Sequence, residues 1–476
     1  MATGKTSSGP GLGATQLLAD YAAGLDPAAL GEQRVAATRR LLLDACGAML
    51  AGAMSDNVTT ACALYRRDTA SAPGAVVAHG AGFGSEHAAL LNGMSAHECG
   101  IDDFHAPSRT HPGAAVVPAV LAAAEVARAG WSDVSAAIAA GYDVTSRISL
   151  AAGVTGLFER GFHPGAVCGA LGAAAGAGRV LKLTPPQFLG ALCLAASQAS
   201  GLLTWEDDTT HVIKSFQLGT AARAGLTGAL FAAQGLLPQV DVLTGRHSLL
   251  RAVGGQVDPA AFANLGEQYT VDEMTLKRHA GCGQLHAAID AVIALRDEEA
   301  VRPEQIDRID VYLADDALAA TDHTPLLTHN LQYVVSVAAT TGTVLPEHFR
   351  PAWTASPAVR DLAGRIVGHA DPELQQRFPA YQSAIVVIQT THGAIRRDVP
   401  MPLGGPGTPL DDAALRAKVA AMAGQAVSGA SIDAVLAAVG TDAGGPDVRA
   451  LISALAAAEP ESSRPQSTLS TVDSGL

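Results

Sequence analysis

Apolar residues recur at helical spacing along most of the first half of the chain. After Glu32 they return every three, four or seven residues and fall on one stripe of a helix, at Val35, Leu42, Cys46, Met49 and Leu50. Further helices are predicted through VSAAIAAGYDVTSRI, capped by Ser132, and through QFLGALCLAASQASGL, capped by Thr184. The small side chains of CGALGAAAGAGRVL predict that two backbones pack closely there.

The pattern changes near Val271. Alternating or β-branched runs predict strands at 308–313 and 384–389, and a turn at His392 and Gly393 leads into a further strand at 394–399. Helical spacing returns after the Pro/Gly-rich segment PMPLGGPGTPLDD. A mixed α/β unit is therefore expected as an insertion in a helical domain. The polar first dozen residues and the final EPESSRPQSTLSTVDSGL lack apolar periodicity and are predicted to be disordered tails.

The composition narrows the class of protein. A chain of 476 residues is long enough for two domains, or for one large domain with an insertion. Hydrophobic residues make up 48% and aromatic residues 4%, so small aliphatic side chains must fill the core. The 31 Lys and Arg residues against 45 Asp and Glu residues give a formal net charge of −14, which opposes binding to nucleic acid or to an anionic membrane.

The chain start and the cysteines indicate a soluble, cytoplasmic protein. The segment MATGKTSSGPGLG has no apolar core of a secretory signal, and the most apolar run is interrupted by Pro118, Glu125 and Arg128. The six cysteines are spread without a CxxC pair, which fits reduced thiols.

A polar loop at 100–113, GIDDFHAPSRTHPG, is expected between two helices, a common place for reactive groups. With His97 before it, the loop offers possible metal ligands at Asp102, Asp103, His105 and His111. Their spacing matches no metal-binding motif, so we predict no metal. The glycines at 77–84 lack a phosphate-loop pattern, and a hairpin or turn is expected there.

Three further polar clusters lie near helical segments. His163 precedes the small-residue helix, Lys214 follows WEDDTTHVI, and Lys277 opens KRHAGCGQLH near the start of the mixed unit. Singly, each has an ordinary explanation as a hydrogen-bonded core imidazole or a solvated helix end. Four clusters in one chain suggest that they converge on one site.

Taken in order, these segments resemble the MmgE/PrpD (2-methylcitrate dehydratase) family, which includes cis-aconitate decarboxylases and iminodisuccinate epimerases. The resemblance covers nearly the whole folded chain and rests on the order and spacing of LLDACGAMLAG, HAALLNGMSAHECGIDD, HPGAAVVPAVLAAAE, GYDVTSRI, GFHPGAVCGALGAAAGAGRVLKL, ALCLAASQASGL, IKSFQLGTAARAGL and KRHAGCGQLHAAIDA. It implies a homodimer without an organic cofactor. The expected layout is a flexible N-terminus (1–12), a helical domain formed by 13–270 and 403–458, an α+β lid (271–402) and a disordered tail (459–476).

The resemblance also implies site residues. An imidazole with a pKa of about 6.5 can move a proton at a carbon beside a carboxylate, and ammonium groups can hold carboxylates and stabilise developing negative charge. Proton transfer is therefore expected from the histidines and anion binding from the lysines of the candidate catalytic set His111, His163, Asp102, Asp103, Lys214 and Lys277. The candidate substrate-binding residues are Arg109, Phe104, His105, Arg278 and Cys282.

Some positions depart from the family pattern His-x-Leu-Asp-Phe-Asp-Asp-Thr. Gly100 stands in place of its first aspartate and Phe104 in place of its threonine. Gln217 stands where a histidine often follows the lysine, and Cys282 where decarboxylases can have histidine. A carboxylate and a hydroxyl are therefore missing, and Phe104 makes the pocket more apolar if it points inward.

The sequence and the resemblance predict a cofactor-independent lyase that acts by proton transfer on a small carboxylate-bearing metabolite. Dehydration by a hydro-lyase is the first specific reaction. Decarboxylation, epimerisation or other isomerisation, and a specialised cyclisation are alternatives on the same fold. A non-catalytic metabolite-binding or scaffold protein is the alternative from another class.

Overall fold

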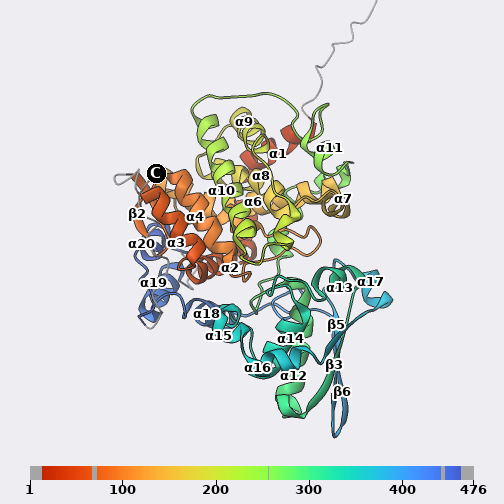
Figure 1. Cartoon of the computed structure of the whole chain (residues 1–476). Coiled ribbons are helices and arrows are strands. Elements are labelled where there is room, and N and C mark those ends of the chain that lie inside the picture. The colour runs from red at the N-terminus through yellow and green to blue at the C-terminus, as the bar shows by residue number, and fades with distance from the viewer. Residues whose placement is uncertain (1–12, 67–71, 256, 441–444, 463–476) are drawn as a thin grey trace, which may run out of the picture.

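The computed structural model describes residues 13–66, 72–255, 257–440 and 445–462. Within them the chain is mainly helical and carries a mixed four-stranded sheet in its C-terminal region (Figure 1). The predicted tail at 1–12 and residues 463–476 of the second tail lie outside the described residues. Residues 459–462 of the second tail are placed, and the Ser428 amide donates to the Glu459 carbonyl at 2.9 Å.

The first part of the chain forms a stack of helices above the sheet in Figure 1. Its helices are α1 (Gly13–Gly24), α2 (Gly31–Gly52), α3 (Asp56–Arg66), α4 (Ser85–Glu98), α5 (Pro112–Ala127), α6 (Trp131–Ala152), α7 (Val154–Glu159), α8 (Pro164–Val180), α9 (Pro185–Ala196), α10 (Val212–Ala233) and α11 (Leu249–Val253). A hairpin of β1 (Ala72–Val76) and β2 (Gly80–Gly82) lies where a hairpin or turn was predicted from the glycines.

Helix α8 lies at the centre of this stack and packs against α5, α6 and α10. Small residues allow this, as predicted from the sequence. A Cβ added at Gly172 would lie 1.8 Å from Thr145 Oγ1 and 2.6 Å from the Gly141 carbonyl oxygen, both on α6. The close approach of α6 and α8 therefore depends on a missing side chain.

Gly172→Ala is expected to lower the free energy of unfolding by roughly 1–3 kcal/mol, because the new methyl group must push α6 away. The matched control is Gly429→Ala at the start of a surface helix, where an added Cβ meets no atom within 4 Å. Its effect is expected to stay below about 1 kcal/mol. Urea denaturation of both variants measures the difference, and equal midpoints would show that α6 and α8 separate at little cost.

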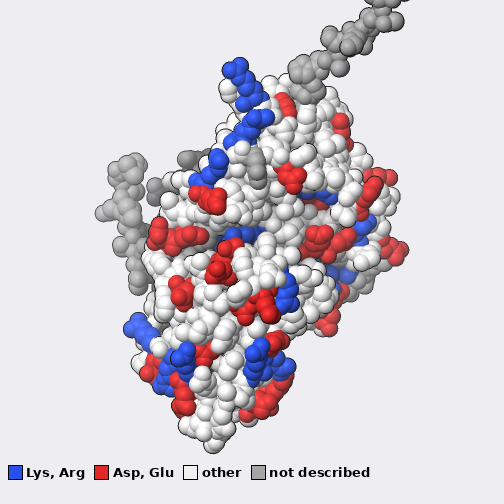
Figure 2. Space-filling view, turned by 90° about the vertical axis from the view of Figure 1, so that its right-hand side faces the viewer, with Lys and Arg blue, Asp and Glu red and all other residues white. Residues whose placement is uncertain are grey.

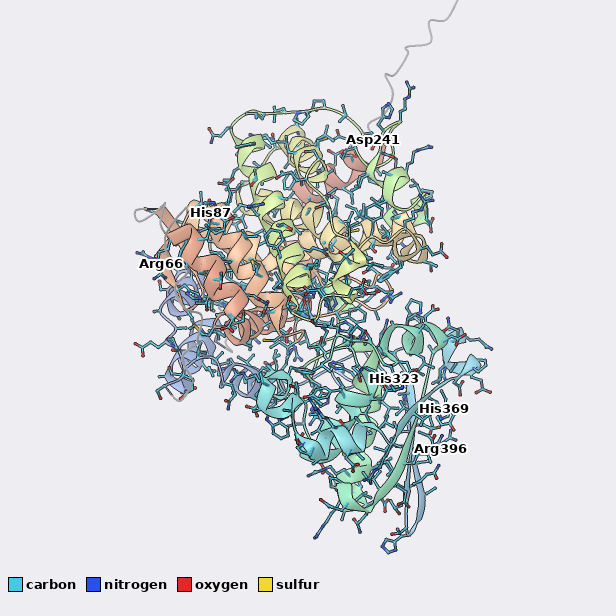
Figure 3. The ribbon with its side chains drawn as sticks, in the orientation of Figure 1. Arg66, His87, Asp241, His323, His369 and Arg396 are labelled. Atoms are coloured by element: carbon cyan, nitrogen blue, oxygen red, sulfur yellow. The ribbon has the colours of Figure 1, made fainter. Side chains whose placement is uncertain are left out.

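The second part of the chain builds the sheet. Its strands β3 (Ile306–Leu313), β4 (Ile366–Ala370), β5 (Ala384–Thr390) and β6 (Gly393–Val399) pair in the order β4-β3-β5-β6, with β4 parallel to β3 and the other neighbours antiparallel. The helices between and before them are α12 (His286–Glu298), α13 (Asp315–Thr321), α14 (Leu331–Thr341), α15 (Pro351–Thr354), α16 (Pro357–Ala363) and α17 (Pro372–Arg377). One face of the sheet packs on α12 and α14, while His369 and Arg396 lie along its other side (Figure 3).

The end of the chain returns to the helical stack. Helix α18 (Asp412–Ala423) packs on α2, and α19 (Gly429–Val439) and α20 (Val448–Ala456) lie beside the first helices and the hairpin (Figure 1). One apolar cluster accordingly joins residues from Ala14 to Leu276 with residues from Leu410 to Ala458, whereas a second cluster is centred on the sheet.

Several local predictions can be compared with the structure. The predicted strands at 308–313, 384–389 and 394–399 are confirmed, as is the cap at Thr184, which forms a capping box. The cap at Ser132 is wrong, because α6 begins at Trp131 and Gly130 holds the N-cap position. Strand β4 was not predicted, since it is short and exposes part of its surface.

The surface carries mixed charge. On the face shown in Figure 2, acidic and basic side chains alternate between broad neutral areas. Among the described residues, none of the helices combines the length and the apolar composition needed to cross a bilayer.

Candidate active site

A cavity of about 290 Å³ lies between the helical stack and the sheet-bearing part. Both parts contribute side chains to it. The helical stack and the loops next to it supply Phe104, Arg109, His111, Phe158, His163, Trp205, Glu206, Asp207 and Lys214, and the later segments supply Lys277, Gly281, Cys282, Gly283, Gln284, Ala319, Ala320, Asp322, Thr324, Pro325, Leu326 and His329. The four polar clusters of the sequence are thus brought together at one cavity.

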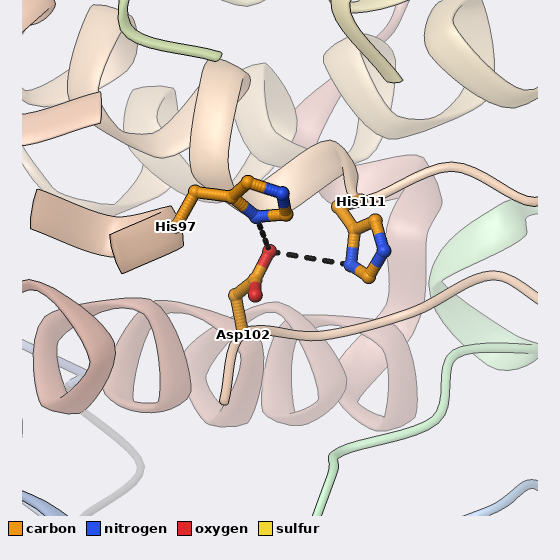
Figure 4. Close-up of side chains that lie close together, drawn as sticks. All are labelled: His97, Asp102 and His111. Atoms are coloured by element: carbon orange, nitrogen blue, oxygen red, sulfur yellow. Dashed lines mark hydrogen bonds and ion pairs between the residues drawn. The ribbon is translucent and has the colours of Figure 1, made fainter. Parts of the chain in front are cut away.

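The buried carboxylate of Asp102 is the centre of a network beside the cavity. Its Oδ2 accepts from His97 Nδ1 at 2.8 Å and lies 3.2 Å from His111 Nδ1 (Figure 4). Its Oδ1 lies 3.5 Å from Lys277 Nζ. Burial alone would raise the pKa of Asp102, but His97 and Lys277 outweigh burial and hold the pKa well below its usual value. Asp102 is therefore an anion that orients two imidazoles.

The partners of His97 and His111 determine which ring nitrogen carries the proton. Nδ1 of His97 faces the Asp102 carboxylate, and Nδ1 of His111 lies 2.8 Å from the Asp103 carbonyl oxygen. Because these partners only accept, Nδ1 carries the proton in both rings and Nε2 is left as an acceptor. Burial lowers the pKa of each ring, so both are neutral at neutral pH.

His163 has the same arrangement through a different partner. The side-chain amide of Gln217 donates from Nε2 to the Leu202 carbonyl at 2.9 Å, which leaves its Oε1 to accept from His163 Nδ1 at 2.8 Å. The free Nε2 of His163 is therefore a proton acceptor at a residue that lines the cavity. Burial and the nearby Lys214 lower the pKa of His163 to about 3.

Lys214 lies on the first turn of α10 and is buried. Its Nζ lies 3.2 Å from His329 Nε2 and 4.4 Å from the centre of the Trp205 ring. Burial, reinforced by the positive charge of Lys277, lowers the pKa of Lys214 to about 8. Lys214 can therefore gain or lose a proton close to neutral pH, which suits a proton donor.

Lys277 is held by two oxygens of the polar loop. Its Nζ donates to the Gly100 carbonyl at 3.0 Å in addition to its contact with Asp102. Gly100 has a φ of +63°, a conformation that favours glycine. The glycine that replaces the first aspartate of the family pattern therefore suits the backbone conformation at this position. An ammonium group has three N–H donors, and one remains for a ligand in the cavity.

Asp103 lies apart from the cavity, although it is adjacent to Asp102 in the sequence. Its carboxyl group accepts from the Tyr142 hydroxyl and from the Gly113 amide at 3.0 Å, at the start of α5. Burial, with a contribution from the charge of Asp44, raises the pKa of Asp103 to about 7. These contacts fit a residue that anchors the loop onto α5 and α6 better than one that touches a substrate.

Three of the predicted substrate-binding residues line the cavity, namely Phe104, Arg109 and Cys282. The Arg109 guanidinium lies 3.8 Å from the centre of the Phe158 ring. The other two lie outside the cavity, against the expectation. His105 is buried between Ser108 Oγ at 2.7 Å and Glu273 Oε2 at 3.2 Å, and Arg278 is exposed.

His97, Asp102 and His111 also place ligand-type atoms within 4.8 Å of one another. A metal ion binds unprotonated nitrogen, whereas the acceptors around both Nδ1 atoms require a proton there. The Lys277 ammonium already faces the same carboxylate. This set of contacts fits a proton-holding network, and the absence of a metal stays a prediction.

Two residues of the site were not predicted as catalytic or substrate-binding. His97 lies in the last turn of α4, five residues before Asp102, and that short spacing was the available signal. His329 lies in the segment TPLLTHN, whose sequence carries no motif. Only the fold brings it to Lys214.

The comparisons with known proteins agree with the resemblance of the sequence. The MmgE/PrpD N-terminal domain matches residues 16–261, and the MmgE/PrpD C-terminal domain matches residues 279–439. A cis-aconitate decarboxylase-like protein of Aspergillus oryzae is 27% identical over 445 residues, which cover 87% of this chain and 91% of that protein.

Two further relatives match over shorter stretches. A cis-aconitate decarboxylase of Aspergillus terreus is 33% identical over 239 residues, which cover 47% of this chain and 48% of that enzyme. The human cis-aconitate decarboxylase is 27% identical over 299 residues, 59% of this chain and 60% of that enzyme. Because the two domain matches together span most of the sequence, this chain belongs to the MmgE/PrpD family.

Proposed function

We propose that this protein is a cofactor-independent lyase that removes a proton from a carbon beside a carboxylate in a small metabolite. The observation that carries the proposal is the combination, at one cavity, of neutral imidazoles with a free Nε2 and buried ammonium groups. His163 is the proposed base, and Lys214 and Lys277 are the proposed carboxylate ligands. His111, oriented by Asp102 and His97, is a second proton-transfer group.

Dehydration is the leading reaction. Nε2 of His163 accepts the proton as the C–H bond beside the carboxylate breaks, and the electron pair is delocalised into the carboxylate, where the two ammonium groups stabilise it. That pair forms the C=C bond as the C–O bond of the β-hydroxyl breaks. The leaving hydroxyl takes a proton from Lys214 and departs as water. His163 then returns its proton, through solvent, to Lys214.

Decarboxylation is a second candidate, because the relatives described above are named cis-aconitate decarboxylases or similar to them. The C–C bond to one carboxylate breaks, carbon dioxide leaves, and the remaining electron pair on carbon takes a proton from Lys214. This reaction needs the ammonium groups but no base at the carbon. His163 therefore separates the two candidates.

The domain layout and the oligomer belong to the same proposal. We assign 271–402 as a lid over a helical domain formed by 13–270 and 403–458, since the cavity has walls from both and the sheet has an apolar cluster of its own. Val271, Met274 and Leu276 of this lid pack in the helical cluster. The homodimer is expected from the family, and light scattering coupled to size-exclusion chromatography measures it.

Incubation of the protein with small hydroxy and unsaturated acids in deuterated water tests the proposal. Proton NMR is expected to show loss of the C–H signal beside a carboxylate as deuterium replaces the proton. It is also expected to show the new alkene signals of the dehydration product. Carbon dioxide release without exchange into the substrate would favour decarboxylation. Binding without exchange or turnover would contradict both and favour the non-catalytic alternative.

The pH dependence of kcat/KM is a specific prediction of these roles. Lys214 acts in its protonated form and has a pKa of about 8, so kcat/KM is expected to fall as the pH rises through that value. His163 acts unprotonated with a pKa of about 3, so an acidic limb near the ordinary histidine value is not expected. Lys214→Arg keeps the positive charge but cannot give up a proton near neutral pH, so its activity is expected to be low and the activity that remains should lack the basic limb. A basic limb unchanged in that variant would assign it to another group.

A further inference from the structure

The charged groups of the cavity are divided by depth. Lys214 and Lys277 are 5% and 2% exposed and lie at its floor. The acidic side chains Glu206, Asp207 and Asp322 are exposed and lie at its mouth. A ligand that reaches the buried ammonium groups therefore passes a negatively charged rim.

The lining also has no net positive charge to offer a polyanion. Its basic residues are Arg109, Lys214 and Lys277, and its acidic residues are equal in number. Lys277 shares its charge with Asp102, and Arg109 interacts electrostatically with Glu206. Among the described residues, Lys214 is the cavity ammonium that has no carboxylate within ion-pair distance. One carboxylate of a ligand is compensated there, whereas a second would have to compete with Glu206 for Arg109 and with Asp102 for Lys277.

The remaining wall is apolar. Phe104, Phe158 and Trp205 contribute aromatic rings, and Ala319, Ala320, Pro325 and Leu326 continue the surface. Arg109 and Lys214 lie against the Phe158 and Trp205 rings, and beyond these two cations a carboxylate on this wall would lose its hydration without gaining a cation. The Trp205 indole N–H has no hydrogen-bond partner among the described residues and is buried behind the ring, so it adds no charge to this wall. The wall therefore fits an uncharged, carbon-rich group.

On the basis of the proposed function, we infer that the substrate is an acid with one carboxylate, held at Lys214 and Lys277, and an uncharged, apolar or unsaturated body against the aromatic wall. A tricarboxylate is disfavoured by the balanced charge of the lining and by the acidic rim. Phe104, Glu206 and Asp322 are the residues that set this preference.

Calorimetric binding of two acids of similar size tests the inference without requiring turnover. The probes are cinnamate, which has one carboxylate and an apolar body, and cis-aconitate, which has three carboxylates. Cinnamate is expected to bind at least about tenfold more tightly at constant ionic strength. Equal or tighter binding of cis-aconitate would overturn the inference. Lys214→Met should weaken cinnamate binding, and unchanged affinity would place the probe elsewhere and also overturn it.

A pair of charge variants tests the rim. Glu206→Gln combined with Asp322→Asn removes two negative charges from the mouth and is expected to strengthen cis-aconitate binding several-fold more than cinnamate binding. The matched control, Glu304→Gln with Asp307→Asn, makes the same charge change at exposed positions outside the cavity lining and should leave the ratio of the two affinities unchanged. Equal ratios in the two double variants would contradict selection by the rim.

The experiments distinguish a failure of the inferred ligand preference from a failure of the proposed chemistry. If no acid shows exchange or turnover but cinnamate binds more tightly, the proposed chemistry is wrong and the ligand preference stands. If exchange occurs and cis-aconitate binds more tightly, the chemistry stands and the single-carboxylate inference is wrong.

Discussion

Replacing His163 by alanine is expected to lower kcat by roughly 10²–10⁴-fold while the protein stays folded. In the wild-type protein, the side-chain oxygen of Gln217 accepts a hydrogen bond from the protonated Nδ1 of His163, and the unprotonated Nε2 remains as the base. Alanine removes that base. The residue immediately precedes α8 and lies outside its small-residue packing, so the loss of the ring leaves the contacts between α8 and α6 in place.

The measurement is the initial rate on an acid that the exchange experiment identifies, with circular dichroism and thermal unfolding of the same sample. His369→Ala is the matched control. It removes an imidazole that also bonds to a polar partner, Asp310, but lies on the sheet and does not line the cavity. A folded His163→Ala protein with the wild-type rate would exclude His163 as the base and would favour decarboxylation, which needs no base at the carbon.

The helical architecture was predictable because the physical cause is local. Apolar side chains at helical spacing must lie on one stripe, and Gly or Ala at a helix contact allows close approach whichever partner is present. The contact between Gly172 and α6 is an example. Strand β4 was not predictable in this way, because its pairing with β3 depends on a neighbour distant in sequence.

The sequence predicted most of the residues that form the site, but not the different roles of Asp102 and Asp103. Asp102 and Asp103 are identical in type and adjacent, so no local pattern separates them. The fold places Lys277 and His97 against Asp102 and places Tyr142 against Asp103. These partners come from different segments of the chain. His97 and Lys277 lower the pKa of Asp102, whereas burial and the charge of Asp44 raise the pKa of Asp103.

Replacing each aspartate by asparagine is expected to have a different effect, because Asp102 and Asp103 have different partners. Asp102→Asn is expected to destabilise the protein by about 3–5 kcal/mol and to reduce activity severely, because it removes one partner of a buried ion pair and leaves Lys277 uncompensated. It also weakens the acceptor that orients His97 and His111. Asp103→Asn is expected to cost less, since the amide keeps an oxygen for the Gly113 amide and can accept from or donate to the Tyr142 hydroxyl.

The pH dependence of stability distinguishes the two positions even if both variants are destabilised. The lowered pKa of Asp102 contributes stability above the ordinary carboxyl value of about 4, and acidification through the folded pKa removes it. The destabilisation by Asp102→Asn should therefore grow as the pH rises from acid towards 5. Asp103 has a pKa raised to about 7, so the wild-type protein loses stability as the pH rises between about 4 and 7. The destabilisation by Asp103→Asn should shrink over that range. Urea denaturation of the three proteins across pH measures both slopes, and parallel slopes would contradict the separate roles assigned to the two aspartates.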